Sequence, residues 1–319
     1  MDARHWTWPC LLGLIVAAGC DRATPPAHAT GASPGAAKTA APAGYVAGEE
    51  AWRKQQDADL RDPKGSWLTV VGLHWITPQT RTVGSAEGQQ LRLALGPAQL
   101  GVIALDGKQL HFTPAPAADV TVDGKPVVGR IALQDDQSGA PTKLAYDGGK
   151  GELWAIERSG RYALRERHQD APALKAVVPQ VYWPIDPSWR VEATLDPHPP
   201  GTTIEIVNVL GDRNQVPNPG ALVFERDGKR FRMEVTGETL SELSGVFADR
   251  TNGRESYGAG RFIDPQGPDA KGRYVLDFNR AYNPPCAFTA FATCPLPPPE
   301  NRLDLAVTAG EKKYPGSPH

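Results

Sequence analysis

Polar side chains with the chemistry to bind an anion are concentrated in the C-terminal part of this 319-residue chain. In the expected strand 273–279, alternation places Asp277 and Asn279 on the same side of the backbone. Arginine side chains offer planar forks of donors that fit a carboxylate or a phosphate. If the loops and strand ends converge, we expect a site for a small molecule, an anionic one in particular. The candidate ligand-binding residues are Arg261, Asp277, Asn279, Asn283, Arg302 and Glu311.

The same charged residues have a second interpretation. They can form a buried ion-pair network that holds one end of the fold together. The two interpretations differ in whether Asp277, Asn279 and Arg302 line a cavity or satisfy one another. The sequence leaves both open.

Two cysteines, Cys286 and Cys294, lie in the proline-rich segment 277–303, which we call the signature segment. Seven residues separate them and no histidine is near, so we expect no metal site. A thiol nucleophile needs a base from elsewhere in the chain. His74 is the best candidate, although a histidine within a strand is more often a core residue. In an oxidising compartment, a disulfide between Cys286 and Cys294 is the simplest outcome.

Composition indicates a globular protein built from strands. Hydrophobic residues make up 40% of the chain and charged residues 22%, with a formal net charge of −2, so we expect no nucleic-acid partner. The 33 glycines and 31 prolines favour many short strands and turns over a helix bundle. No nucleotide-binding loop, metal-ligand cluster or nucleophile elbow is present in the sequence, which therefore implies no cofactor and no reaction class.

The N-terminus has the features of an export signal. An apolar run, residues 11–18, is too short to span a bilayer and ends at Ala17-Ala18-Gly19-Cys20. This sequence resembles a bacterial lipobox, which implies that Cys20 is lipidated and that the membrane is a partner. Residues 21–45 are rich in alanine and proline and predict a flexible tether. We expect a lipid-anchored protein on the periplasmic or extracytoplasmic face of a bacterial cell envelope, with the choice of membrane open.

The remaining chain predicts one helix followed by two β domains. Residues 48–60 form the expected helix, with acidic residues in its first turn. Short apolar runs separated by Asp-Gly turns at 106–107 and 123–124 then predict a β-sandwich within a domain of residues 46–168. A second series, including runs at 177–183 and 303–308, predicts a domain of residues 169–319. This second domain is expected to be either a β-sandwich or a small β-barrel, whose mouth would have room for one ligand.

The first domain distantly resembles a forkhead-associated domain in the order of its features. The family binds phosphothreonine through an arginine, a serine and an asparagine in its loops. The corresponding places here hold Ser85, the neutral run 99–101 and Asp123. A phosphate would lack charge-assisted donors at these positions, so the resemblance implies the fold without phosphopeptide binding.

A more specific resemblance rests on four stretches that occur in the same order. They are "SWLTVVGLHWI" (66–76), "FADRTNGRESYGAGRFI" (247–263), "LDFNRAYNPPCAFTAFATCPLPPPENRL" (276–303) and "AGEKKY" (309–314). Together they resemble the domain-of-unknown-function family 1684, which implies no reaction, substrate or cofactor.

We therefore expect a lipoprotein that binds a small molecule in its C-terminal domain. One alternative is a hydrolase that uses Cys286 or Asp277. Another is an envelope protein-interaction module, which would present an exposed apolar patch on the first domain to a protein partner of unknown identity.

Overall fold

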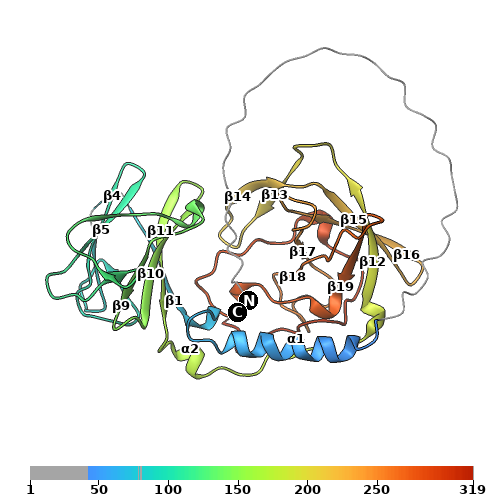
Figure 1. The fold of residues 1–319 in the computed structure, drawn as a ribbon, viewed down its shortest axis with the longest axis horizontal. Coiled ribbons are helices and arrows are strands. Elements are labelled where there is room, and N and C mark those ends of the chain that lie inside the picture. Colours follow the sequence, from blue (N-terminus) through green and yellow to red (C-terminus); the bar gives the residue numbers. More distant parts are fainter. Residues whose placement is uncertain (1–41, 78, 80, 319) are drawn as a thin grey trace, which may run out of the picture.

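The computed structural model describes residues 42–77, 79 and 81–318, and it consists mainly of β-strands (Figure 1). The predicted fold class, mainly β with a short N-terminal helix, is confirmed. The expected signal 1–20, with Cys20, and the tether up to residue 41 lie outside the described residues. Within the described ranges, no helix is long and apolar enough to cross a membrane.

Two sheets face each other in the part of the chain that we call the first lobe, Val70 to His168. One has the strand order β1-β11-β10-β9-β6-β7, and the other β3-β2-β4-β5-β8. Phe112 and Leu153 are fully buried between them, as expected for a β-sandwich. The strands are β1 (Val70–Trp75), β2 (Arg81–Gly84), β3 (Leu91–Arg92), β4 (Gly101–Asp106), β5 (Gln109–Pro114), β6 (Thr121–Val122), β7 (Lys125–Pro126), β8 (Ile131–Leu133), β9 (Lys143–Tyr146), β10 (Gly151–Arg158) and β11 (Arg161–His168).

The second lobe, from Arg190 onward, is built on a four-stranded sheet of order β16-β15-β12-β19. Its aromatic core includes Phe224 and Phe247, each with its ring centroid 5.5 Å from that of Phe278. Two hairpins, β13–β14 and β17–β18, lie beside the sheet. The strands are β12 (Arg190–Pro197), β13 (Thr203–Val207), β14 (Arg213–Pro217), β15 (Gly220–Arg226), β16 (Lys229–Val235), β17 (Gly245–Phe247), β18 (Arg261–Ile263) and β19 (Arg273–Asp277).

The second lobe does not form the small barrel that was one of the two expectations. Its main sheet ends at β16 and β19, and the hairpins remain separate two-stranded sheets. The core is completed by the signature segment, which contains short 3₁₀ turns in place of strands, η4 (Phe278–Arg280), η5 (Pro285–Ala287) and η6 (Pro299–Asn301). Prolines stand at or next to two of these turns, where they cannot donate to a sheet ladder.

Two expected strands are also absent. Residues 177–183 meet the C-terminal segment at one bridge, Tyr182 to Glu311. Residues 303–308 form no ladder, although Leu303 N–H donates to Ala248 O at 2.8 Å. Trp183 and Leu303 are both buried. The apolar residues of these runs therefore signalled burial and not strand pairing.

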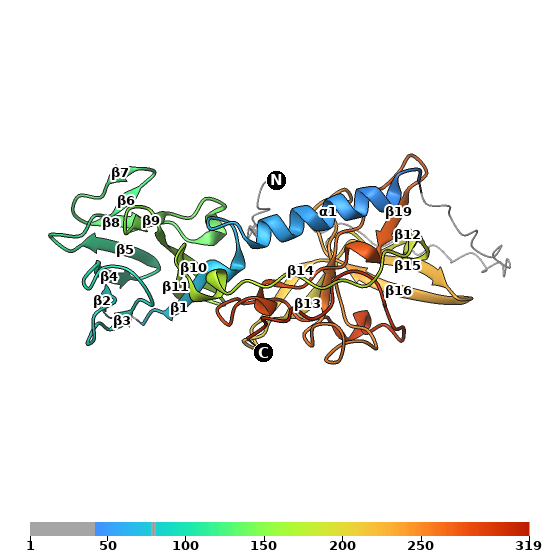
Figure 2. The same ribbon diagram turned by 90° about the horizontal axis from the view of Figure 1, so that it is seen from below.

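Helix α1 (Tyr45–Leu60) lies along the second lobe in both ribbon views (Figures 1 and 2). It begins three residues earlier than expected, so no acidic residue falls in its first turn. Its buried residues are Glu49 and Leu60. The helix is consequently held to the rest of the molecule largely through polar groups. A second, short helix, α2 (Pro172–Lys175), follows β11.

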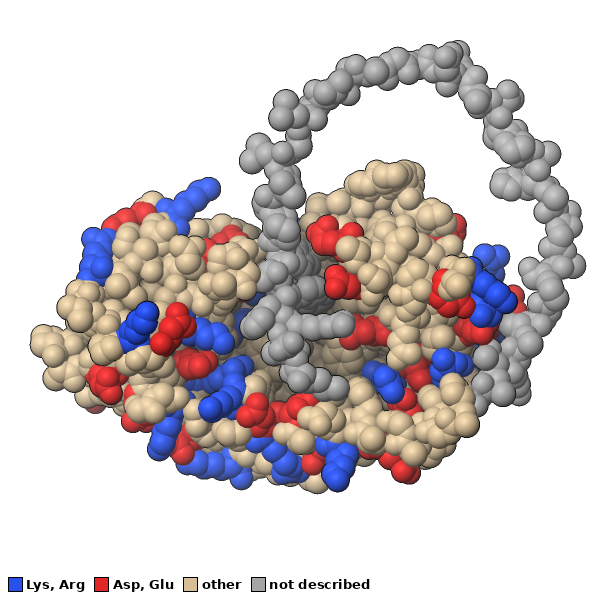
Figure 3. All heavy atoms as spheres, in the orientation of Figure 1, with Lys and Arg blue, Asp and Glu red and all other residues tan. Residues whose placement is uncertain are grey.

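Acidic and basic side chains are interspersed over the face of the molecule shown in Figure 3. This distribution fits the formal net charge of −2. Interspersed charges largely cancel one another at a distance, so this face produces little long-range field.

Candidate functional site

Asp277 and Asn279 lie together in a polar cluster beneath helix α1. The Tyr45 hydroxyl is 2.8 Å from both carboxylate oxygens of Asp277. Asn279 Nδ2 donates to the Tyr45 hydroxyl at 2.9 Å and to Asp186 O at 2.8 Å, and its Oδ1 accepts from Asp186 N–H at 3.0 Å. The two candidate residues thus satisfy each other and anchor the first turn of α1.

Further along α1, two more side chains reach the same surface of the second lobe. Glu49 is 1% exposed and forms an ion pair of 2.8 Å with Arg280. The guanidinium of Arg53 lies 4.6 Å from the ring centroid of Tyr182. Burial lowers the pKa of Arg53, and its Nε and Nη2 have no hydrogen-bond partner among the described residues.

Asn283 and Glu311 form a second contact. The Glu311 carboxylate accepts from Asn283 N–H at 2.7 Å and from the Tyr182 hydroxyl at 3.3 Å. Burial raises the pKa of Glu311 to about 7, against its usual value of 4.5. The carboxyl group therefore has its pKa near neutrality, because the hydrogen bonds from Asn283 and Tyr182 and the charge of Arg261 offset its desolvation only in part.

Arg261 is fully buried and ties the C-terminal segment to β18. Its Nη2 contacts Asp249 Oδ2 at 2.5 Å and donates to Val307 O at 2.9 Å. Its Nη1 donates to the carbonyls of Ala309 and Glu311, at 2.6 and 3.1 Å. Burial lowers its pKa, with Asp249 opposing that shift. All the carbonyls it holds belong to an irregular segment, so Arg261 supplies donors that a strand partner would otherwise supply.

Arg302 stands apart from the other five candidates. Its side chain is exposed, and its backbone forms an isolated bridge with Ala248. The structure therefore joins Asp277 with Asn279, and Asn283 with Glu311 and Arg261, but it does not bring Arg302 to either group. Neither of the two cavities described below includes any of the six residues.

Cys286 and Cys294 are buried free thiols that lie side by side. Cys286 N–H is directed at Cys294 Sγ, 3.0 Å away. The hydrogen bond from Cys294 lowers the pKa of Cys286, whereas burial raises the pKa of Cys294. Tyr257, Ala287 and other apolar residues surround the pair, and in the described part of the chain no histidine is hydrogen-bonded to either sulfur. A disulfide in an oxidising compartment stays a prediction.

The residues between the two cysteines connect the signature segment to the first lobe. Thr289 Oγ1 donates to Val70 O at 2.9 Å. Arg158 Nε donates to Thr293 Oγ1 at 3.2 Å. This part of the signature segment is therefore a strap between the lobes.

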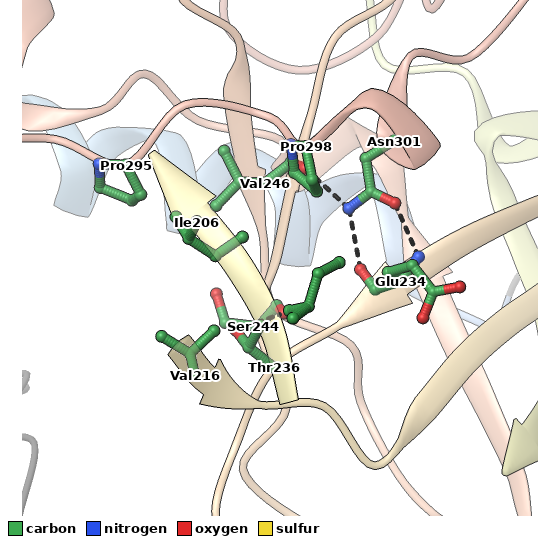
Figure 4. Close-up of a pocket in the computed structure, with 10 residues that line it drawn as sticks. Ile206, Val216, Glu234, Thr236, Ser244, Val246, Pro295, Pro298 and Asn301 are labelled. Carbon is green, nitrogen blue, oxygen red and sulfur yellow. Dashed lines mark hydrogen bonds between the residues drawn. The ribbon is translucent and has the colours of Figure 1, made fainter. Parts of the chain in front are cut away.

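A small cavity in the second lobe has a volume of about 20 Å³, which is enough for roughly one water molecule. At its edge, Asn301 Nδ2 donates to Glu234 O at 2.8 Å and to Val246 O at 2.9 Å (Figure 4). Asn301 Oδ1 accepts from Glu234 N–H at 2.7 Å. Asn301 thus links the signature segment to β16 and β17, and the cavity is too small for a ligand.

A much larger hollow, of about 500 Å³, lies on the first lobe beside the strap. His74 is on its wall, and His74 Nε2 is 3.0 Å from Glu166 Oε2. Glu166 is fully buried and also accepts from the N–H groups of Ala94 and Leu95, at 3.0 and 3.1 Å. The lining residues are Val71, Gly72, Leu73, His74, Ser85, Arg92, Leu93, Ala94 and Phe291.

Gly72 leaves room for this histidine–glutamate pair. A Cβ at position 72 would lie 2.6 Å from both Glu166 Oε2 and His74 Nε2, which is closer than real Cβ contacts allow. Sequence reasoning considered His74 as a base for a thiol but missed its partner Glu166 and the wall residues Arg92 and Phe291. The signal that was present is the Gly-x-His spacing within an otherwise apolar strand.

Comparison with known proteins identifies relatives but no activity. The sequence model described as "Protein of unknown function (DUF1684)" matches residues 180–312. The solution NMR structure of an uncharacterized protein from Haloarcula marismortui is 33% identical, with 43% of this chain and 78% of that chain covered and a TM-score of 0.36. No curated protein matches the chain. Through residues 180–312, the chain belongs to the family of proteins of unknown function DUF1684.

Proposed function

We propose that this protein is a lipid-anchored, extracytoplasmic binding protein that takes up a small anionic molecule in the hollow beside the strap. The volume of the hollow, about 500 Å³, carries the proposal. Ligand sites in proteins typically measure about 300 to 1,000 Å³. The cavity near Asn301 is far below this range.

The lining of the hollow suits an anion with an apolar part. Arg92 is exposed and His74 is partly exposed, and no acidic residue is among the lining residues. Leu73 and Phe291 supply apolar surface, whereas the side chain of Leu93 is buried in the core of the first lobe. Polar and apolar surface contribute about equally to the wall, so polar groups can fix the orientation of a ligand while the apolar groups contact its hydrocarbon part.

The position of Phe291 connects the hollow to the signature segment. Phe291 follows Thr289, whose hydroxyl is bound to Val70 O at the start of β1. The strap therefore places an aromatic wall from the second lobe against a hollow of the first lobe. Five of the six candidate residues, all except Arg302, are engaged in contacts with helix α1 or the C-terminal segment, and none of the six lines the hollow.

The two alternative functions gain no comparable observation. Among the described residues, no histidine or carboxylate is hydrogen-bonded to the Cys286 thiol, and Asp277 is engaged by Tyr45. Among the described residues of the first lobe, Val128 is the one large apolar side chain that is strongly exposed, 87%, so no apolar docking patch forms there.

Titration of the ¹⁵N-labelled protein with succinate, citrate and N-acetylglutamate tests the proposal. We expect amide shifts at Leu73, Leu93 and Phe291 for at least one of these acids. The Arg92→Ala variant should weaken that binding about tenfold or more, because a charge-assisted hydrogen bond is lost. Arg230→Ala, an exposed arginine on β16, is the control. Absence of shifts at these amides with all three acids at millimolar concentration, or equal weakening in the control, would overturn the proposal.

A further inference from the structure

We propose that the natural occupant of the hollow is an extended peptide with an acidic side chain, which adds as a strand to the free edge of β1. This inference rests on the proposed function because it places the ligand in the same hollow. It goes further by assigning the main recognition to backbone groups of β1.

The lining residues show that an edge of β1 borders the hollow. Val71, Gly72, Leu73 and His74 are four consecutive residues of one strand. Side chains of a strand alternate between its two faces, so a cavity on one face would contact every second residue. Contact with four in succession means that the hollow runs along the edge.

The hydrogen-bond pattern shows that this edge is unpaired. β1 is the outermost strand of its six-stranded sheet and pairs with β11 alone. Ile76 N–H donates to Tyr162 O at 2.8 Å, and the register continues as His74 opposite Leu164. In an antiparallel ladder, bonded pairs alternate with non-bonded ones. Leu73 and Trp75 therefore direct their N–H and C=O groups away from β11.

No other segment in the described part of the chain takes up the backbone groups of Leu73. The hydroxyl of Thr289 binds the carbonyl of Val70, so the strap closes the edge just before the hollow begins. On the opposite wall, the N–H groups of Ala94 and Leu95 are bound to Glu166. A peptide in the hollow would thus find its backbone partners on β1.

The dimensions and side chains fit a short peptide strand. Five residues of β1, 71–75, extend over roughly 16 Å. Unpaired edges of this kind recognise extended peptides through backbone hydrogen bonds, with side-chain pockets giving specificity. Phe291 would contact an apolar side chain of the peptide, whereas Arg92 would attract a carboxylate.

Peptides with modified backbones test the inference directly. The probes are acetyl- and amide-capped pentapeptides of alternating Val and Thr that carry Glu at one position, with Lys counterparts. We expect the Glu peptides to bind and to shift the Leu73 amide, and the Lys peptides to bind at least about tenfold more weakly. N-methylation of single amides in the best peptide should abolish binding at every second position, because alternate N–H groups face β1.

The outcomes separate this inference from the proposed function. If the small acids bind but no pentapeptide does, or if N-methylation has no alternating effect, the strand-addition proposal is wrong. The proposal that the hollow binds a small anion is then retained. If neither the acids nor the peptides bind, the proposed function and the strand-addition proposal are both wrong. If the free protein is a dimer with a protected Leu73 amide, the edge pairs with a second copy and the peptide proposal is wrong.

Two substitutions at one residue provide a matched test on the protein. Leu73→Pro removes the outward N–H, which an edge strand tolerates because this group is not part of the β1–β11 ladder. We expect peptide binding to weaken about tenfold in Leu73→Pro and by less than about threefold in Leu73→Ala. Equal affinities would contradict pairing at this residue. If Leu73→Pro does not fold, the N-methylated peptides decide the question.

Discussion

At the scale of single residues, the family segment uses its charges mainly as internal ties. Arg261 holds three carbonyls and Asp249, and Asn283 and Tyr182 share the Glu311 carboxyl group. Removing one member of such a buried network leaves its partners without hydrogen bonds, which costs more than the network contributes when intact. These residues therefore matter for the fold whether or not they also meet a ligand.

Glu311 makes the free energy of unfolding depend on pH. Its pKa is about 7 in the folded protein and about 4.5 when unfolded, so the folded state binds more protons between these values. The free energy of unfolding therefore falls as the pH rises through this window. From pH 5 to pH 8, we expect a loss of about 2 to 3 kcal/mol from this group.

Urea denaturation of Glu311→Gln at both pH values measures this contribution. Glutamine cannot ionise but keeps an oxygen that accepts from the Asn283 N–H. The free energy of unfolding of the variant should therefore fall less between pH 5 and pH 8 than that of the parent protein. Glu238→Gln, at an exposed glutamate, is the control and should behave like the parent. Identical pH dependence in all three proteins would show that Glu311 does not titrate in this range.

At the scale of elements, helix α1 depends on polar contacts at its first turns. The helix buries Glu49 and Leu60, while Tyr45 and Glu49 bond to residues at the end of β19 and in η4. Isolated helices of this length are marginal in water, so the contacts with the second lobe decide whether α1 persists. The signature segment supplies those contacts and, through Thr289, also holds β1.

Tyr45→Phe should loosen α1 without unfolding the sheets. The change removes a hydroxyl that donates to Asp277 and accepts from Asn279, and a buried group left unpaired costs about 1 to 3 kcal/mol. We expect amides of residues 48–54 to exchange with solvent faster, by about tenfold or more. Val46→Ala, at a side chain that is 46% exposed, should leave exchange unchanged. Unaltered exchange in Tyr45→Phe would mean that this hydroxyl does not hold the helix.

At the scale of the whole molecule, one segment joins three parts of the structure. The signature segment begins beneath α1, bonds to the first lobe through Thr289 and Thr293, and ends on β16 through Asn301. It works as a strap. Because Phe291 lies in the middle of this strap, any movement between the lobes would change the wall of the hollow.

Membrane attachment is a prediction that belongs to the intact chain, since Cys20 lies outside the described residues. We expect the full-length protein to be recovered in the membrane fraction and to incorporate a labelled fatty acid. Cys20→Ala should abolish both, because alanine has no thiol to carry the acyl chains that hold the protein at the membrane. Cys10→Ala, within the segment expected to be removed, is the matched control. Fatty-acid incorporation that persists in Cys20→Ala would show that the anchor is elsewhere.

Local sequence signals determined the elements whose stability is local. The Asp-Gly pair at 123–124 forms the expected hairpin turn, with positive φ at both residues, and the pair at 227–228 turns the β15–β16 hairpin in the same way. Alternating apolar runs identified most strands, because this pattern reflects backbone geometry alone. The existence of α1 was predicted correctly, but its start was not, because the acidic residues expected in the first turn lie beyond it. The distinctive motifs of the C-terminal half identified the family.

The contacts between distant segments could be decided only by the tertiary structure. Runs 177–183 and 303–308 have the composition of strands, but neither joins a ladder. The first run forms one isolated bridge, at Tyr182, and Leu303 of the second donates a single backbone hydrogen bond to Ala248 O. Asp277 and Asn279 are occupied because Tyr45, more than 230 positions away, folds over them. The hollow likewise combines an open strand edge, a buried glutamate and one phenylalanine from the strap. Sequence periodicity indicates which residues are buried and where the chain turns. A site depends on which of these residues lie close together in the folded protein, and that is decided by contacts between distant segments.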